Sequence, residues 1–241
     1  MDALSPDNTV GDIVTRYPGA LPVFERLGID YCCGGGRRLD EAASASGVGW
    51  QEVAAQIGAA LTAAADSPAQ PSWADAPLTD LMGHIVGRYH GKLRELMPML
   101  SQMGDKVINA HGERHPEVGD VASTFAGLRN ELESHMMKEE HVLFPFIEQL
   151  ESGLGHRHPM LGHISSPIAM MMQEHDSAGA ALATLRAATA SYTAPPDGCT
   201  TFKGYYDQLA VLERELHEHI HLENNILFPR AAALEARVMG R

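Results

Sequence analysis

Two stretches of this sequence pair a histidine with a glutamate four residues later, His135 with Glu139 and His219 with Glu223. On an α-helix the side chains at positions i and i+4 are neighbours on one face, so each pair can reach a common point. Imidazole nitrogen and carboxylate oxygen are both good ligands for divalent metal ions. The types and spacing of these residues therefore indicate metal coordination.

The two pairs lie in copies of one sequence unit. Residues 135–145 align without gaps on residues 219–229, and five of the eleven positions are identical. The offset is 84 residues, and two single histidines, His90 and His175, are related by an offset of 85. If the two copies fold antiparallel about a pseudo-twofold axis, four imidazoles and two carboxylates meet at one level.

A lone histidine on an apolar face is usually a core residue that hydrogen bonds to a neighbour. Six polar groups at one level are different, because burying them unpaired costs several kcal/mol each and the faces offer no Lys or Arg. They are also too many for one tetrahedral zinc ion, and thiolates are absent. We therefore expect two iron ions, with manganese as the second choice, each capped by two imidazoles and bridged by both carboxylates. The predicted ligands are His90, His135, Glu139, His175, His219 and Glu223.

Long helices must position these ligands. Four amphipathic stretches place apolar residues at steps of three and four, with the predicted ligands in the middle of each apolar face. The faces run from Met82 to Leu100, from Leu128 to Leu150, from Ile168 to Leu185 and from Leu209 to Leu227. Segments rich in Gly, His, Pro or Thr separate them. The pattern predicts an all-α fold built on an up-down four-helix bundle.

A smaller helical unit is expected before the bundle. The sequence predicts a first short helix capped by Thr9, then helices over 21–27, 39–45 and 50–65. Residues 66–72 have the composition of a linker, rich in Pro and Ser. The predicted division is a small domain over residues 1–66, a linker over 67–77 and the bundle domain over 78–241.

Composition narrows the class of protein. The chain has 241 residues and a net charge of −13, which disfavours binding to nucleic acid or to an anionic membrane surface. No apolar run approaches the roughly 18 residues of a membrane-spanning helix. Three cysteines are too few for a disulfide framework, and the first 14 residues lack the pattern of a signal peptide. We therefore expect a cytoplasmic protein.

Two of the three cysteines, Cys32 and Cys33, are adjacent and precede three glycines and Arg37-Arg38. Either they are small residues in a turn, or they act in redox chemistry or relay iron. The glycines and arginines predict a mobile, basic setting that favours thiolate. A disulfide between adjacent cysteines closes a strained ring and would be readily reduced.

The remaining histidines are expected outside the metal site. Five are predicted in solvent-exposed loops, and four on helices but off the ligand faces. The loop set is His111, His115, His156, His158 and His163, and the helical set is His84, His141, His217 and His221.

The motifs together resemble a known family. The first motif is Asp30-Tyr31-Cys32-Cys33-Gly34-Gly35, and the others are Arg88-Tyr89-His90, Ser134 to Glu140, Glu174-His175-Asp176 and Leu222 to Asn225. In this order they are similar to the repair-of-iron-centres family, which pairs an N-terminal Cys-Cys domain with a hemerythrin-like di-iron domain. The ligand spacing resembles hemerythrin-like bundles rather than ferritin-like ones, whose signature is Glu-x-x-His. The segment around 155–159 is longer than the family leads us to expect.

The resemblance implies a fold, a cofactor and a function. The fold is a hemerythrin-like four-helix bundle after a small helical domain, and the cofactor is a di-iron centre with an oxo or hydroxo bridge. The implied function is repair of iron–sulfur clusters damaged by nitrosative or oxidative stress, with iron–sulfur proteins as clients and nitric oxide or oxygen species as small ligands. The alternative is a nitric oxide sensor or sink without a client. The sequence leaves the oligomeric state open, with a homodimer as one option.

Overall fold

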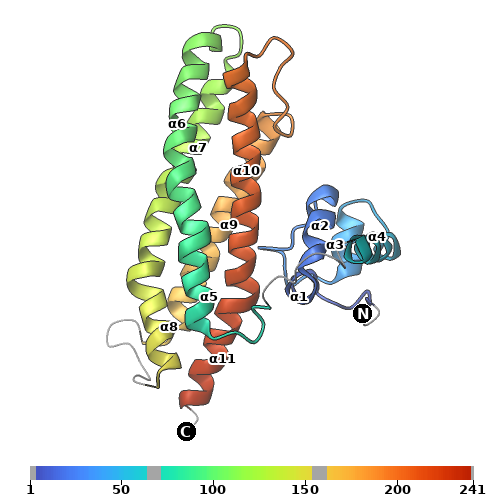
Figure 1. The fold of residues 1–241 in the computed structure, drawn as a ribbon, viewed down its shortest axis with the longest axis vertical. Helices are drawn as coiled ribbons and strands as arrows, with labels where there is room; N and C mark the ends of the chain where they lie inside the picture. The colour runs from blue at the N-terminus through green and yellow to red at the C-terminus, as the bar shows by residue number, and fades with distance from the viewer. Residues whose placement is uncertain (1–3, 64–71, 154–161, 240–241) are drawn as a thin grey trace.

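The computed structural model describes residues 4–63, 72–153 and 162–239. Within these ranges the regular elements are helices, accompanied by an isolated bridge between Thr9 and Arg38. A long bundle stands beside a smaller helical unit, which lies at the middle of the bundle's length (Figure 1). The predicted all-α class is confirmed.

The smaller unit contains the short helices expected from the sequence. They are α1 (Val10–Arg16), α2 (Leu21–Leu27), α3 (Leu39–Ala45) and α4 (Trp50–Ala63), with a 3-10 turn over Pro18–Ala20. Thr9 caps α1, because its hydroxyl accepts a hydrogen bond of 3.2 Å from the Asp12 backbone N–H. The left-handed Gly28 (φ 64°) ends α2. The unit has its own apolar core, which includes Phe24, Tyr31, Leu39 and Ile57.

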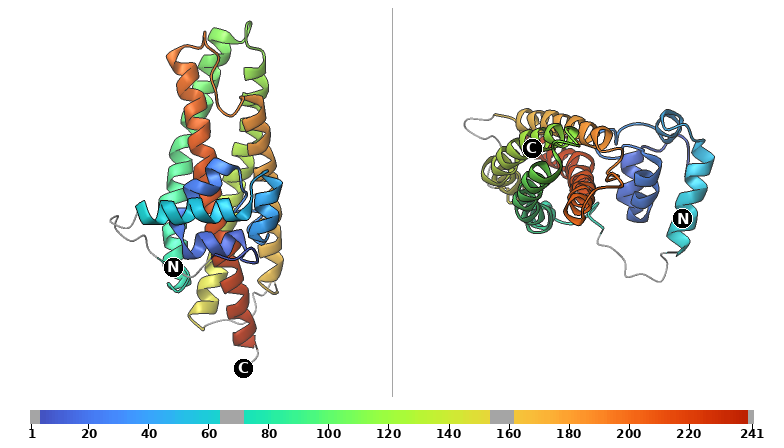
Figure 2. Two further views of the ribbon diagram at one scale, coloured as in Figure 1. Left: turned by 90° about the vertical axis from the view of Figure 1, so that its right-hand side faces the viewer. Right: turned by 90° about the horizontal axis from the view of Figure 1, so that it is seen from above.

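The bundle consists of four long helical rods. The first is α5 (Leu78–His84), a π-helical turn (Ile85–His90) and α6 (Gly91–His111); the second is α7 (Glu117–Lys138), a π-helical turn (Glu139–Leu143) and α8 (Phe144–Glu151). The third is α9 (Ser165–Ala188), and the fourth is α10 (Thr200–Leu222), a π-helical turn (Glu223–Leu227) and α11 (Phe228–Met239). Successive rods run in opposite directions, as expected for an up-down bundle (Figures 1 and 2).

Three of the rods contain a π-helical turn where a predicted ligand lies. His90, Glu139 and Glu223 each lie within such a turn, whereas the amphipathic pattern predicts uninterrupted α-helix there. A π turn is wider than an α turn, and single π turns inside α-helices are frequent at functional sites. Each wider turn rotates the side chains that follow it around the helix axis, relative to their positions in an uninterrupted α-helix.

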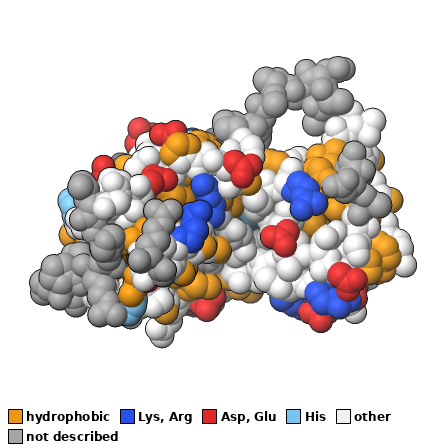
Figure 3. All heavy atoms as spheres, turned by 90° about the horizontal axis from the view of Figure 1, so that it is seen from below, with side chains coloured by type: hydrophobic (Ala, Val, Ile, Leu, Met, Phe, Trp, Pro, Cys, Tyr) orange, Lys and Arg blue, Asp and Glu red, His pale blue; other side chains and the backbone are white. Residues whose placement is uncertain are grey.

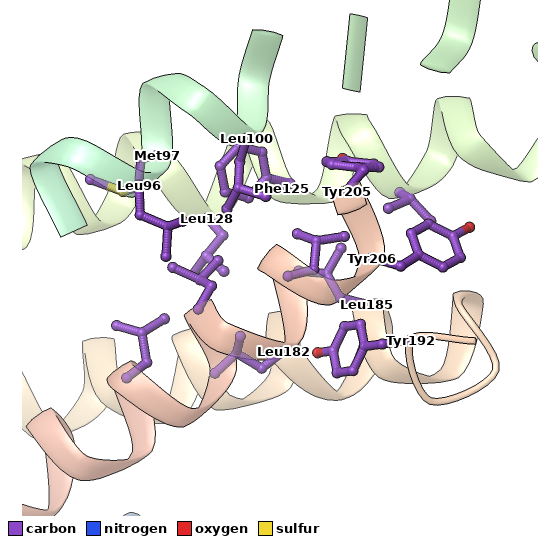
Figure 4. Close-up of a cluster of buried hydrophobic side chains, with 14 of the residues drawn as sticks. Leu96, Met97, Leu100, Phe125, Leu128, Leu182, Leu185, Tyr192, Tyr205 and Tyr206 are labelled. Atoms are coloured by element: carbon purple, nitrogen blue, oxygen red, sulfur yellow. The ribbon is translucent and has the colours of Figure 1, made fainter. Parts of the chain in front are cut away.

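Two apolar cores enclose a polar layer. One core fills the upper bundle, where Leu100, Phe125, Leu185 and Tyr205 point toward one another (Figure 4). The other fills the lower end and is formed by α5, α8, α11 and the residues beside them. The six predicted ligands lie along the rods between these cores, so they occupy a region of low dielectric constant.

The small unit packs against α9 and the fourth rod (Figure 2). Ile220 of α10 belongs to the apolar core of the small unit. The face seen from below carries acidic, basic and apolar side chains side by side (Figure 3). Among the described residues, the helices lack the length and apolar character needed to cross a membrane.

Candidate metal centre

The six predicted ligands converge at one level of the bundle. They come from all four rods, and each is at most 3% exposed. Their donor atoms form two groups that share both carboxylates. We call His90 and His219 with the two glutamates the 90/219 group, and His135 and His175 with the same glutamates the 135/175 group; within each group the donor atoms lie within 4.8 Å of one another.

In each group the two imidazoles face each other through Nε2. The Nε2 atoms of His90 and His219 are 3.2 Å apart, and those of His135 and His175 are 3.1 Å apart. Two ligands bound at about 2.1 Å and at right angles to each other lie about 3 Å apart. The separations therefore match those of two nitrogen ligands on one metal ion.

Each carboxylate spans both groups. Glu139 Oε2 lies 3.4 Å from His90 Nε2, and its Oε1 lies 3.4 Å from His135 Nε2. Glu223 Oε1 lies 3.0 Å from His219 Nε2, and its Oε2 lies 3.1 Å from His175 Nε2. One oxygen of each glutamate therefore faces each group, which is the arrangement of a bridging carboxylate.

The charge of the two glutamates is buried. Burial and the neighbouring Glu223 favour the neutral form of Glu139, yet the imidazoles of His135 and His90 outweigh them and lower its pKa. Burial likewise favours neutral Glu223, and His219 and His175 lower its pKa well below the usual range. Both oxygens of Glu139 and Oε2 of Glu223 lack a hydrogen-bond partner among the described residues. Such buried anionic oxygens favour a cation, and the nitrogen and oxygen donor set suits iron or manganese.

Three of the four imidazoles have an acceptor on their outer nitrogen. His90 Nδ1 lies 2.6 Å from Glu140, and His135 Nδ1 lies 2.9 Å from Glu174. Such partners fix the orientation of a ligand ring and raise its basicity. Arg94 and Lys138 pair with these two carboxylates in turn.

On the third imidazole the acceptor is an amide, since Asn224 Oδ1 lies 2.8 Å from Nδ1 of His175. Nδ1 of the fourth, His219, is buried without a partner among the described residues. The sequence reasoning missed these acceptors, although Glu140 and Asn224 directly follow the two bridging glutamates. Their position in the repeat was the signal available.

The adjacent cysteines lie against the bundle beside this site. Cys33 Sγ is 3.6 Å from the backbone oxygen of His175, and both thiols are free. A cleft of about 460 Å³ opens next to them, between the small unit and α9, and Asp176 and Arg186 form part of its wall. The structure thus places the thiols near one group of donors, while their chemistry stays a prediction.

The expected basic setting of the cysteines is wrong for Cys32. Its thiol contacts Cys33, is buried, and lies 3.3 Å from Asp30 Oδ1, and together these raise its pKa. Arg38 does not offset this effect, because it pairs with Asp40 and Asp7. The neutral thiol is therefore favoured at Cys32.

The glycine stretch is a tightly packed turn rather than the mobile segment expected from composition. Asn225 Nδ2 donates to the backbone oxygens of Tyr31 (3.1 Å) and Cys32 (3.2 Å). A Cβ at Gly35 would lie 2.0 Å from Asn225 Oδ1, and one at Gly11 would lie 2.6 Å from the same atom. A side chain at either position would displace the Asn225 amide, so glycine allows this contact between the small unit and the bundle.

The other described histidines lie outside the two groups, but one prediction about them is wrong. His111 was expected in an exposed loop, whereas it ends α6, is 7% exposed and packs against Phe202.

The remaining described histidines differ in their contacts and exposure. His115 bridges Glu117 and Asp197, His163 lies 3.5 Å from Glu235, and His84 stacks on Trp73. His217 and His221 face the small unit, through Glu25 and Tyr31 respectively, and His141 is exposed. His156 and His158, with the segment 155–159, fall outside the described residues.

Comparison with known proteins agrees with this geometry. The model of the hemerythrin HHE cation-binding domain matches residues 81–231, and that of a domain of unknown function, DUF542, matches residues 6–61. The chain is 37% identical to the iron-sulfur cluster repair protein YtfE of Citrobacter koseri over 229 residues, which is 95% of this chain and 98% of that protein. It is 38% identical, with the same coverage, to the YtfE proteins of Salmonella paratyphi B and Salmonella newport.

Proposed function

The chain belongs to the hemerythrin HHE cation-binding family. We propose that it is an iron–sulfur cluster repair protein whose bundle holds two iron ions. One observation carries the proposal: two buried donor groups share two carboxylates, and three of the four carboxylate oxygens have no hydrogen-bond partner among the described residues. His90 and His219 would hold one ion and His135 and His175 the other, with Glu139 and Glu223 bridging.

The residues of the chain prepare this site. Glu140, Glu174 and Asn224 orient three of the ligand rings, and the two apolar cores keep water from the polar layer. Iron bound there supplies redox and ligand-exchange chemistry with nitric oxide or peroxide. We propose that iron released from the site is the substrate passed to a damaged cluster, whose protein is the client.

We propose that the chain has two domains with different roles. Residues 1–66 form a small domain that docks on the client or relays iron through Cys32 and Cys33, residues 67–77 form a linker, and residues 78–241 form the metal-binding domain. The matches of two separate family models to residues 6–61 and 81–231 support this division. We place this activity in the cytoplasm, where thiols stay reduced.

Metal analysis and a repair assay test the proposal. Freshly purified protein should contain two irons per chain and show the charge-transfer band of an oxo-bridged pair. It should restore activity to an aconitase-type enzyme damaged by nitric oxide. Replacing Cys32 and Cys33 together with Ser should leave the iron spectrum unchanged and reduce repair, whereas Cys199→Ser, at an exposed thiol, should affect neither.

Three results would contradict parts of the proposal. A protein without bound iron would refute the metal site. Tight binding of nitric oxide without any restoration of the damaged enzyme would instead favour a nitric oxide sensor or sink. Undiminished repair by the double serine variant would reject only the role proposed for Cys32 and Cys33. The two cysteines would then be structural residues of the domain interface.

A further inference from the structure

The two halves of the repeat surround the two donor groups with different residues. Glu140 follows the bridging Glu139, whereas its counterpart 84 positions later is Asn224. Glu174 precedes the ligand His175, whereas the residue in the same place of the first half is Tyr89, 85 positions earlier. The pseudo-twofold symmetry of the ligands therefore does not extend to their neighbours.

This difference leaves the two groups unequally supported. In the 135/175 group both outer nitrogens have an acceptor, Glu174 at 2.9 Å and Asn224 at 2.8 Å. In the 90/219 group Glu140 supports His90 at 2.6 Å, but Nδ1 of His219 is buried with no partner in the part of the chain that the structure describes.

Tyr89 accounts for the missing acceptor. Its ring stacks on that of His219, with the centroids 5.8 Å apart and the planes inclined by 13°. Its hydroxyl donates to Glu218 at 3.1 Å and so does not reach Nδ1 of His219. Glu174, in the equivalent place of the other half, reaches the outer nitrogen of His135 and is held there by Lys138.

Asn224, the counterpart of Glu140 in the second half, makes a contact that a glutamate could not make. Its Oδ1 accepts from His175, and its Nδ2 lies 3.5 Å from the backbone oxygen of Cys32. A glutamate at this position, like Glu140, could accept but not donate. The amide therefore supports a ligand ring and contacts the small unit at the same time, and it ties the 135/175 group to the domain interface.

We infer that the two metal positions are unequal and that the ion in the 90/219 group is the exchangeable one, the iron that the protein gives up. The inference rests on the proposed function, which supplies the two bound ions and, for its last clause, the donation of iron. Loss of the partner on the outer nitrogen of a ligand histidine typically lowers metal affinity about 10- to 100-fold. We expect the ion of the 90/219 group to be released faster than the other by a factor of about that size.

Release of iron into a chelator tests the inference without any repair assay. The full-length protein is loaded anaerobically with two equivalents of ferrous iron and mixed with an excess of a ferrous chelator, and both the released and the retained iron are followed. The expected time course has two phases of one iron each, with rates that differ about 10- to 100-fold. Release of both irons in one phase would overturn the inference.

Two matched variants assign the phases. Glu140→Gln and Glu174→Gln make the same change on opposite groups, at side chains that are 20% and 30% exposed and that each pair with one basic residue. Glu140→Gln should accelerate the fast phase alone, and Glu174→Gln should accelerate the slow phase so that the two converge. Glu215→Gln, which breaks a pair with Arg88 and contacts no ligand ring, should leave both phases unchanged.

The outcomes separate this inference from the proposed function. If Glu140→Gln acts on the slow phase, the assignment of the exchangeable ion is wrong even if the protein repairs clusters. If iron is released in two unequal phases but the protein repairs no cluster, the two metal positions are unequal and the proposed donation of iron to a client is wrong. A protein that binds fewer than two ions would overturn both proposals.

Discussion

Raising the pH of the metal-free protein should destabilise it. Burial favours the neutral imidazole of His135, but the adjacent Glu139 outweighs burial and raises the pKa to about 9. A histidine whose pKa is raised on folding stabilises the protein fully below its ordinary pKa of 6.5. That stabilisation is lost as the pH rises through the folded-state value, so the relevant window runs from about pH 6.5 to about pH 9.

The difference between 6.5 and about 9, at about 1.4 kcal/mol per pH unit, corresponds to about 3.5 kcal/mol in the free energy of unfolding. His90 and His217 act in the same direction, because nearby carboxylates raise the pKa of each against the effect of burial. With a urea m-value of about 3 kcal/mol/M, the loss is about 1 M in the unfolding midpoint.

Urea unfolding of chelator-treated protein at pH 6.5, 7.5, 8.5 and 9, followed by circular dichroism, measures this loss. The metal-loaded protein is the control, since its ligand histidines are already neutral and metal binding strengthens as protons leave. Its midpoint should not fall in parallel. A midpoint of the metal-free protein that stays constant or rises between pH 6.5 and 9 would refute the charge assignment of the buried layer.

Three further predictions concern the site and the domain interface. Glu223→Ala removes a bridging carboxylate, so iron content per chain should fall and the thermal midpoint with it, and unchanged metal content would reject the bridge. A chain of residues 72–241 retains all six ligands and both bundle cores, so it should fold and bind metal; failure to do so would make the small domain part of the site. Asn225→Ala removes the hydrogen bonds to the backbone of Tyr31 and Cys32, so amide exchange in residues 30–35 should accelerate while metal content stays constant.

The sequence was sufficient for the architecture because the helical pattern is long and regular. Apolar residues at steps of three and four identify all four rods, and the internal repeat alone predicts that the imidazoles and carboxylates meet at one level. The π-helical turns at His90, Glu139 and Glu223 could not be predicted in this way. They depend on the packing of four rods around polar side chains, and the local sequence of each rod contains no sign of that packing.

Neighbours in space explain why the predictions for His111 and Cys32 are wrong. Gly112 and the polar residues after it suggest a loop around His111, but Phe202 of α10 covers the ring and the helix continues to that residue. The prediction for Cys32 rests on the arginines that follow it in the sequence, whereas its thiol lies against Asp30. In both cases the decisive contact depends on how the chain folds back, which composition does not reveal.

The close approach of Asn225 to Gly11 and Gly35 determines how near the small unit lies to the bundle. A methyl group at either glycine would overlap the Asn225 side chain, which would have to move away from its hydrogen bonds to the backbone of Tyr31 and Cys32. A single alanine would therefore weaken the contact between the cysteine-bearing unit and the bundle without changing a ligand or a thiol. Gly35→Ala thus offers a way to loosen the contact between the cysteines and the candidate metal centre while the side chains of both stay unchanged.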